Sequence, residues 1–111
     1  MINIDKNNLI NDPSPYLKQH KDNPVNWQIW SSEIIEIAKK NFRPKKNSVI
    51  SLVRLACHHF EVEDILPLVS WLKKSGYKIA INIMQIPELS FREIRNTVKT
   101  IKKTRTDILY F

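Results

Sequence analysis

The sequence predicts an α/β fold in which a parallel βαβαβ segment follows an N-terminal segment with few regular elements. Three observations predict it. From residue 48 to the C-terminus, strand-like apolar runs alternate with amphipathic, helix-like stretches. Residues 1 to 30 are instead rich in Asn, Asp and Pro. At 111 residues, 42% of them apolar, the chain can form one domain with a modest core.

The first part of the chain is predicted to be extended or turning up to residue 30, with one helix after it. Each proline there removes a backbone donor and disfavours helix before it; these are Pro13, Pro15 and Pro24. A helix is expected over residues 32 to 41, because Ser31 or Ser32 can cap it and its last turn carries Lys39 and Lys40. The basic stretch RPKKN that follows is the best candidate for an internal seam.

The second part begins with a predicted strand over residues 48 to 56, whose apolar run suggests burial on both faces. Apolar residues at helical spacing then predict a helix that ends near Gly76. Pro67 fits its first turn if Asp64 is the N-cap.

A second strand is predicted over residues 77 to 83. Ser90 and Glu93 form a capping box at the start of another helix, and residues 107 to 111 form a third strand. Right-handed crossovers between adjacent parallel strands place both helices on one face of the sheet. The other face must then be covered by the N-terminal part or by something absent from this chain. The apolar ending at Phe111 suggests a truncated product.

Composition narrows the possible partners and compartment. The net charge of +7 is accompanied by no nucleic-acid-binding motif, so no specific nucleic acid is expected. No apolar stretch approaches the roughly 18 residues of a membrane span, so no membrane partner is expected. One cysteine excludes an intramolecular disulfide, which fits a cytoplasmic protein. A basic cluster is expected to be the solvated face of the last helix; it comprises Lys99, Lys102, Lys103 and Arg105.

The N-terminal part resembles the opening of the thioredoxin-like domain of the spermatogenesis-associated protein 20 family. The resemblance covers residues 7 to about 46 and rests on the stretches NLIN, SPYL, QH and NPVNW, followed by Trp30. It implies that Trp27 and Trp30 belong to a structural signature that fastens the N-terminal segment. In that family the next strand runs into a Cys-His-Trp-Cys-His segment similar to a modified thioredoxin active site.

Here the stretch ACHHFE can be aligned with that segment, so that Cys57 and His58 take its first two positions. His59 then takes the place of Trp, and Phe60 takes the place of the second cysteine. Dithiol exchange needs a second thiol to resolve the mixed disulfide. The departure at Phe60 therefore predicts that this chain is not a thioredoxin-type oxidoreductase.

The C-terminal part, from about residue 52 to 111, resembles the pyruvate carboxyltransferase-like aldolases, which are relatives of hydroxymethylglutaryl-CoA lyase with a (β/α)8 TIM barrel. The resemblance rests on VRLACHHFEVED, WLKKSGYKIAINIMQI and DILYF. It implies that this part is a barrel fragment of consecutive strands and helices. The Asp-Arg-Glu and His-x-His metal motifs of that family are absent from the sequence.

Cys57, His58 and His59 are the candidate redox or metal-binding residues. Adjacent residues of a strand point to opposite faces, so Cys57 and His58 should not converge there. Cys57 and His59 could share a face, but a zinc site needs about three protein ligands. We therefore assign no catalytic residue, cofactor or metal, and expect Cys57 to be a small buried hydrophobe. His20 receives no role.

The sequence thus predicts two partial domains, a thioredoxin-like segment over residues 1 to 46 and a βαβαβ segment over residues 47 to 111. We expect a non-catalytic remnant of a thioredoxin-like protein rather than an enzyme. Two alternatives remain open, a truncated aldolase-like or lyase-like barrel piece and a single-cysteine thioredoxin-like redox protein. An exposed edge at the third strand predicts self-association.

Overall fold

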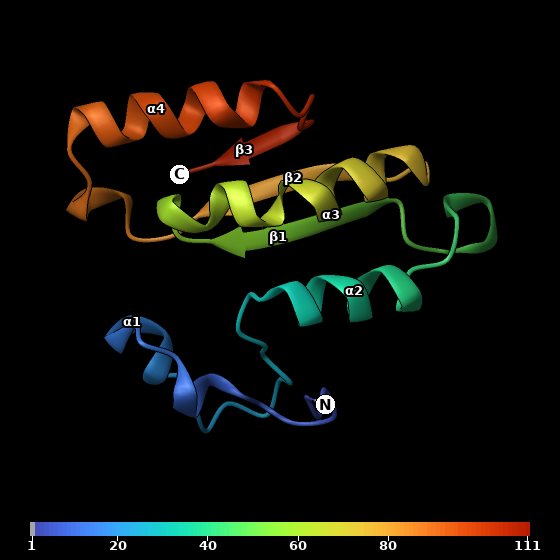
Figure 1. Cartoon of the computed structure of the whole chain (residues 1–111), viewed down its shortest axis with the longest axis horizontal. Coiled ribbons are helices and arrows are strands. Elements are labelled where there is room, and N and C mark those ends of the chain that lie inside the picture. The colour runs from blue at the N-terminus through green and yellow to red at the C-terminus, as the bar shows by residue number, and fades with distance from the viewer. Residues whose placement is uncertain (1) are drawn as a thin grey trace.

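The computed structural model describes residues 2–111 and shows three parallel strands with helices along one side (Figure 1). The helices and strands follow in the order α1 (Pro15–Lys18), α2 (Ser32–Asn41), β1 (Leu52–Cys57), α3 (Val62–Lys74), β2 (Lys78–Ile83), α4 (Phe91–Lys102) and β3 (Ile108–Tyr110). Short 3₁₀ helices lie at Leu9–Asn11, Lys45–Asn47, His59–Glu61 and Ile86–Glu88. The predicted α/β fold with a parallel βαβαβ segment is confirmed.

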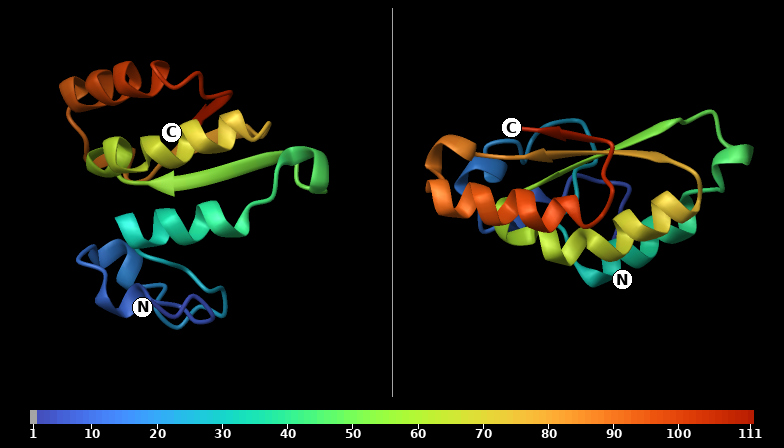
Figure 2. Two further views of the ribbon diagram at one scale, coloured as in Figure 1. Left: turned by 45° about the vertical axis from the view of Figure 1, so that its right-hand side comes forward. Right: turned by 90° about the horizontal axis from the view of Figure 1, so that it is seen from above.

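The sheet has the order β1-β2-β3, and both neighbouring pairs are parallel. The register places Arg54 beside Ala80, and Ala80 beside Ile108. Helices α2, α3 and α4 all lie on one face of this sheet, as the view from above shows (Figure 2). The prediction that both crossover helices share one face is therefore confirmed.

The core lies between that face and α3, with a contribution from α2. Alternate strand residues point into it, including Val53, Leu55 and Ile81. The buried side of α3 meets them; it consists of Val62, Ile65, Leu68, Val69 and Leu72. Ile35 of α2 belongs to the same buried cluster. Burial of these side chains is the main contribution to stability, at about 1.5–3 kcal/mol for each fully buried aliphatic group.

The opposite face of the sheet is covered by no described helix, although Ala80 at its centre is buried, and here one prediction was wrong. The first strand covers Leu52–Cys57 rather than residues 48 to 56, and only alternate residues along it are buried. Leu52 is 41% exposed on this face, and Ile108 and Tyr110 are 39% and 41% exposed. The Arg54 guanidinium lies 4.6 Å from the centre of the Tyr110 ring and covers part of it. No described helix lies over this face, so the strand keeps one exposed side.

The helix boundaries agree with the sequence except at the start of α3. Ser31 caps α2, and Ser90 and Glu93 form the predicted capping box of α4. Helix α3, however, begins at Val62, two residues before the predicted N-cap Asp64. Pro67 therefore lies inside the helix rather than in its first turn. The earlier start follows from the turn that comes directly before α3, in which His58 and Glu61 form a capping box.

The N-terminal segment is attached to the sheet through a tryptophan. Trp30 Nε1 donates a 2.7 Å hydrogen bond to the carbonyl of Ala56 in β1. Within the segment, the amide of Asn8 donates to the carbonyl of Trp27 at 2.9 Å. The boundary predicted between residues 46 and 47 stays a prediction. None of the helices among residues 2–111 has the length and apolar character needed to cross a membrane.

Candidate functional site

Cys57 is the last residue of β1, and its side chain is completely buried in the core on the helix-covered face. Its exposed fraction is 0%. Burial raises the pKa of the Cys57 thiol to about 12, and the negative charge of Glu61 adds to the rise. Because the thiolate is the nucleophile and the metal ligand, this environment keeps the cysteine in its unreactive form.

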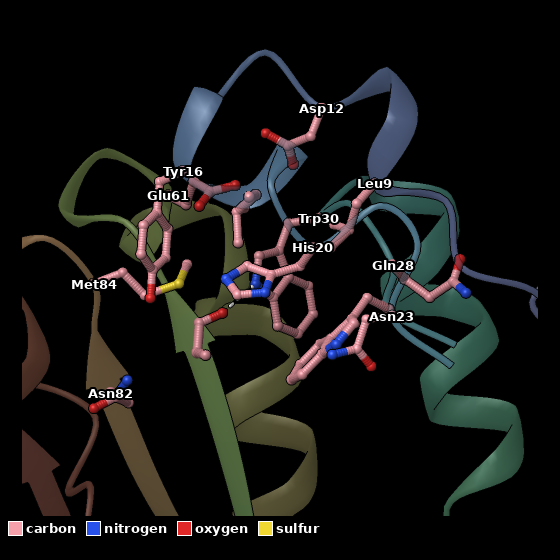
Figure 3. A pocket seen from close by; sticks show the side chains of 13 residues that line it. Leu9, Asp12, Tyr16, His20, Asn23, Gln28, Trp30, Glu61, Asn82 and Met84 are labelled. Atoms are coloured by element: carbon pink, nitrogen blue, oxygen red, sulfur yellow. Dashed lines mark hydrogen bonds between the residues drawn. The ribbon is translucent and has the colours of Figure 1, made fainter. Parts of the chain in front are cut away.

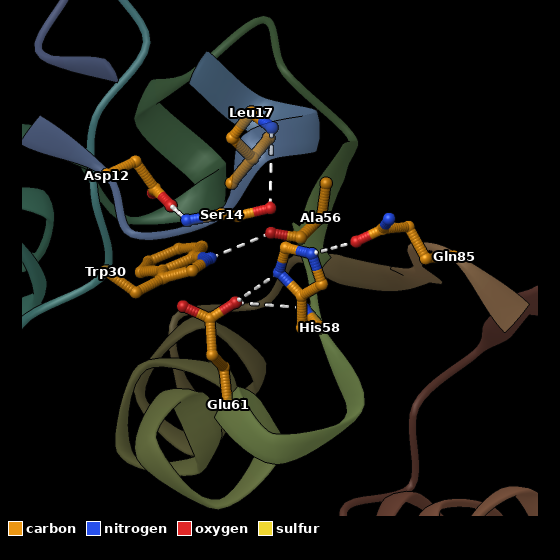
Figure 4. A network of polar contacts seen from close by, with 8 residues as sticks. All are labelled: Asp12, Ser14, Leu17, Trp30, Ala56, His58, Glu61 and Gln85. Carbon is orange, nitrogen blue, oxygen red and sulfur yellow. Dashed lines mark hydrogen bonds and ion pairs between the residues drawn. The ribbon is translucent and has the colours of Figure 1, made fainter. Parts of the chain in front are cut away.

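His58 enters a polar network at the end of the strand (Figure 4). Its backbone amide donates to Glu61 Oε1 at 2.9 Å, and its ring Nδ1 lies 3.1 Å from the same oxygen. Its ring Nε2 lies 2.8 Å from Gln85 Oε1. His58 is itself buried, with 6% exposure. These contacts use both ring nitrogens to fix the turn between β1 and α3.

His59 points in a third direction, toward α4. Its Nε2 lies 3.0 Å from Glu93 Oε2. Hydrogen bonds from the backbone and side chain of Ser90 lower the pKa of Glu93, and His59 contributes less. Cys57, His58 and His59 are therefore separated by the structure rather than brought together. Among residues 2–111, no three His, Cys, Asp or Glu side chains gather as a set of metal ligands.

A cavity of about 330 Å³ lies near the carboxyl ends of β1 and β2, beneath the N-terminal segment (Figure 3). Aromatic side chains line it, including Tyr16, Trp27 and Trp30. Two carboxylates, those of Asp12 and Glu61, also line it. The N-terminal segment and the strand ends thus surround this space together.

The sequence reasoning missed most of this cavity. It gave His20 no role, whereas His20 lines the cavity and packs edge-on against Tyr16 at 5.7 Å between ring centres. It treated Trp27 and Trp30 together as structural, but Trp27 is 45% exposed at the cavity. Tyr16 and Glu61 belong to the stretches that carry the family resemblance but were given no role at a site, and neither was Asp12. The sequence feature that could have indicated this cavity is the concentration of aromatic and His residues between positions 16 and 30.

Among known families, the model Thioredox_DsbH, described as "Protein of unknown function, DUF255", matches the chain. It covers residues 6–65, which include α1, α2, β1 and the Cys57-His58-His59 stretch. No solved structure matches the chain.

Three curated relatives are each similar to somewhat more than half of this chain. Spermatogenesis-associated protein 20 of Rattus norvegicus is 46% identical over 58 residues, which are 52% of this chain and 7% of the relative. The human protein of the same name is 42% identical over 58 residues, with the same shares. A protein of Caenorhabditis elegans, described as uncharacterized, is 40% identical over 64 residues, 58% of this chain and 9% of the relative. The chain thus spans less than a tenth of the length of these relatives.

These matches confirm the first resemblance and extend it beyond residue 46, to residue 65. None of them supports the resemblance of the C-terminal part to aldolases.

Proposed function

We propose that this chain, which belongs to the thioredoxin-like DsbH family, is a member that performs no dithiol exchange and acts as a non-catalytic module. One observation carries the proposal. The single cysteine of the chain, Cys57, is 0% exposed and belongs to the buried core. At the position where the family resemblance predicts a redox cysteine, the thiol is thus completely buried.

The chemistry of exchange explains why this matters. A thiolate must attack a disulfide sulfur, and a second thiol must then resolve the mixed disulfide. At a pKa of about 12, only about one molecule in 10⁵ carries the thiolate at pH 7. Phe60, at the position aligned with the second cysteine, has no thiol to offer and is 66% exposed. The chain therefore lacks a reactive group both for the attack on a disulfide and for the resolution of the mixed disulfide.

Insulin reduction by dithiothreitol tests the proposal. The intact chain should add nothing to the rate of dithiothreitol alone, and Cys57→Ala should behave identically. A thioredoxin run in parallel shows that the assay detects catalysis. A rate above the dithiothreitol blank that disappears in Cys57→Ala would show that Cys57 is redox-active and would overturn the proposal.

A second candidate function, a lyase-like activity of the C-terminal part, is favoured by one observation. The strand order β1-β2-β3 is consecutive and parallel, with crossover helices on one face, as in a segment of a (β/α)8 barrel. The test is cleavage of a 2-keto acid or an acyl-CoA substrate in the presence of Mg²⁺ or Mn²⁺. Under our proposal no metal-dependent cleavage occurs; metal-dependent cleavage would favour the lyase instead.

A further inference from the structure

We propose that the cavity beneath the N-terminal segment binds a small primary amine with a flat apolar body, such as an arylalkylamine. Cys57 is not among the residues that line this site, and the binding does not depend on thiol chemistry. The proposal rests on three features of the cavity, which are its aromatic walls, its two carboxylates and its lack of Lys and Arg.

The walls suit a flat apolar group. The volume of about 330 Å³ falls at the lower end of the roughly 300–1,000 Å³ typical of small-molecule sites. Tyr16 and Trp27 are 40% and 45% exposed, so large parts of their surfaces remain uncovered. Trp30 also lines the cavity, and its bond to the Ala56 carbonyl holds it against β1. Aromatic faces attract both flat apolar groups and cations.

The two carboxylates each have an oxygen to spare. Asp12 is 5% exposed, and its Oδ1 accepts from the amide of Ser14 at 2.8 Å. Glu61 uses Oε1 for both contacts with His58. Their second oxygens accept no hydrogen bond from residues 2–111. No fully buried side-chain oxygen among residues 2–111 lacks a partner, so neither of these second oxygens is fully buried. The cavity is the space that both carboxylates border (Figure 3).

The charge of the lining selects a cation. The whole chain carries a net charge of +7, yet no Lys or Arg is among the described residues that line the cavity. His20 is the single ionisable base there. Asp12 has the Ser14 amide and Glu61 the His58 amide and ring as partners, and a bound ammonium group would add a charge-assisted bond to a carboxylate oxygen that has none. A primary ammonium also has N–H donors for both spare oxygens, which a quaternary ammonium lacks.

Titration with 2-phenylethylamine at pH 8 tests the proposal, with tryptophan fluorescence as the signal. Trp27 and Trp30 line the cavity, whereas Trp71 lies in α3 outside it. We expect saturable binding of the amine. Two analogues of similar shape, uncharged 2-phenylethanol and anionic 3-phenylpropionate, should bind at least about tenfold more weakly, because each lacks the charge-assisted bonds. A lysine mimic, N-acetyl-lysine N-methylamide, should also bind at least about tenfold more weakly, because it lacks the flat body.

Two conservative variants locate the site. Asp12→Asn and Glu61→Gln keep an oxygen for the Ser14 and His58 contacts but remove the charge. Each should weaken amine binding at least about fivefold. Asp22→Asn removes the charge of an exposed residue outside the lining and should leave binding unchanged.

If the variants fail to fold, the proposal can still be tested, because two-dimensional NMR of the unaltered chain detects binding at the same cavity. The indole N–H signals of Trp27 and Trp30 should shift on amine addition, and that of Trp71 should not. Four results would overturn the proposal: no saturable binding, equal affinity for the alcohol, unchanged binding in both lining variants, or shifts confined to Trp71. Tighter binding of the lysine mimic would overturn the small-molecule assignment and indicate a protein side chain as the ligand.

Discussion

At the scale of single residues, Cys57 shows how burial controls chemistry. The side chain is packed in the core with no exposure, where a neutral thiol behaves as a small apolar group. Ionising it would place a negative charge in that core, close enough to Glu61 for repulsion to add to the cost of desolvation. The raised pKa therefore means that the thiol is unreactive in the folded chain and that ionising it would destabilise the fold.

The first prediction concerns stability at alkaline pH. The thiol has a pKa of about 12 in the folded chain and an ordinary value of 9.0. Between these values the unfolded chain releases the proton and the folded chain keeps it, so the free energy of unfolding falls as pH rises. The slope from this one group approaches about 1.4 kcal/mol per pH unit. Urea unfolding at pH 8, 9.5 and 10.5 measures it.

Cys57→Ala is the control for that measurement, because other groups also titrate in this range. The variant loses a constant amount of stability from the cavity it creates, but it cannot contribute the thiol's pH dependence. The difference in unfolding free energy between the two proteins should shrink as pH rises. A difference that stays constant from pH 8 to 10.5 would show that Cys57 is not protected as described.

The burial of Cys57 could be predicted from the apolar run that contains it, whereas the contacts of the two histidines could not. His58 meets Gln85, which is distant in the sequence and has a left-handed backbone with φ of 59°. His59 meets Glu93 at the start of α4. Such pairs depend on the strand register and the crossover geometry. The local sequence pattern contains no information on such pairs.

At the scale of elements, the link between the N-terminal segment and β1 is the feature that creates the cavity. The indole of Trp30 donates to Ala56, and the segment before it covers the strand ends. The resemblance to the spermatogenesis-associated protein 20 family implied such a fastening role for the two tryptophans. The geometry assigns the hydrogen bond to Trp30 and leaves Trp27 at the cavity.

The second prediction is that Trp30→Phe loosens this segment. The variant keeps an aromatic ring but loses the 2.7 Å hydrogen bond and leaves the Ala56 carbonyl without its partner. The expected loss is about 1 kcal/mol of unfolding free energy. Hydrogen exchange should become faster in residues 6 to 30 and stay unchanged in α3. Trp27→Phe is the matched control, and equal exchange in the two variants would contradict the role of the bond.

The errors in element boundaries have physical causes. The first strand was predicted to be buried on both faces because its open face also carries apolar residues, Leu52 and Ala56, which conceal the alternation. The start of α3 was misplaced because the 3₁₀ helix directly before it is capped by His58, a residue that is not among the preferred N-caps. By contrast, α2 and α4 were predicted well, since each begins at a serine that caps it.

At the scale of the whole molecule, the open sheet face and the edge strand β3 determine how the chain should behave in solution. Leu52, Ile108 and Tyr110 are partly exposed on that face, and Phe111 is 60% exposed beyond the edge. Strand edges with unpaired backbone groups favour pairing with another chain. The net charge of +7 opposes such pairing by self-repulsion.

The third prediction is salt-dependent self-association. Raising the salt from 0.1 M to 1 M shortens the Debye length from about 10 Å to about 3 Å, which screens the repulsion. The apparent mass measured by light scattering should therefore increase with salt. Ile108→Lys places a charge on the open face and should reduce the increase. Phe91→Lys adds the same charge on α4, where Phe91 is 75% exposed, and should reduce it less. A monomeric mass at every salt concentration would contradict the prediction.

The central claim, that the thiol of this family member is sealed, is tested most directly by the rate at which a thiol reagent modifies Cys57 in the native chain. With 5,5′-dithiobis(2-nitrobenzoate) at pH 8, the chain unfolded in urea should react at the rate of a free thiol, because its cysteine regains an ordinary pKa and full access. The folded chain should react at least about a hundredfold more slowly, at a rate limited by opening of the core. Equal rates for the folded and unfolded chains would contradict the claim.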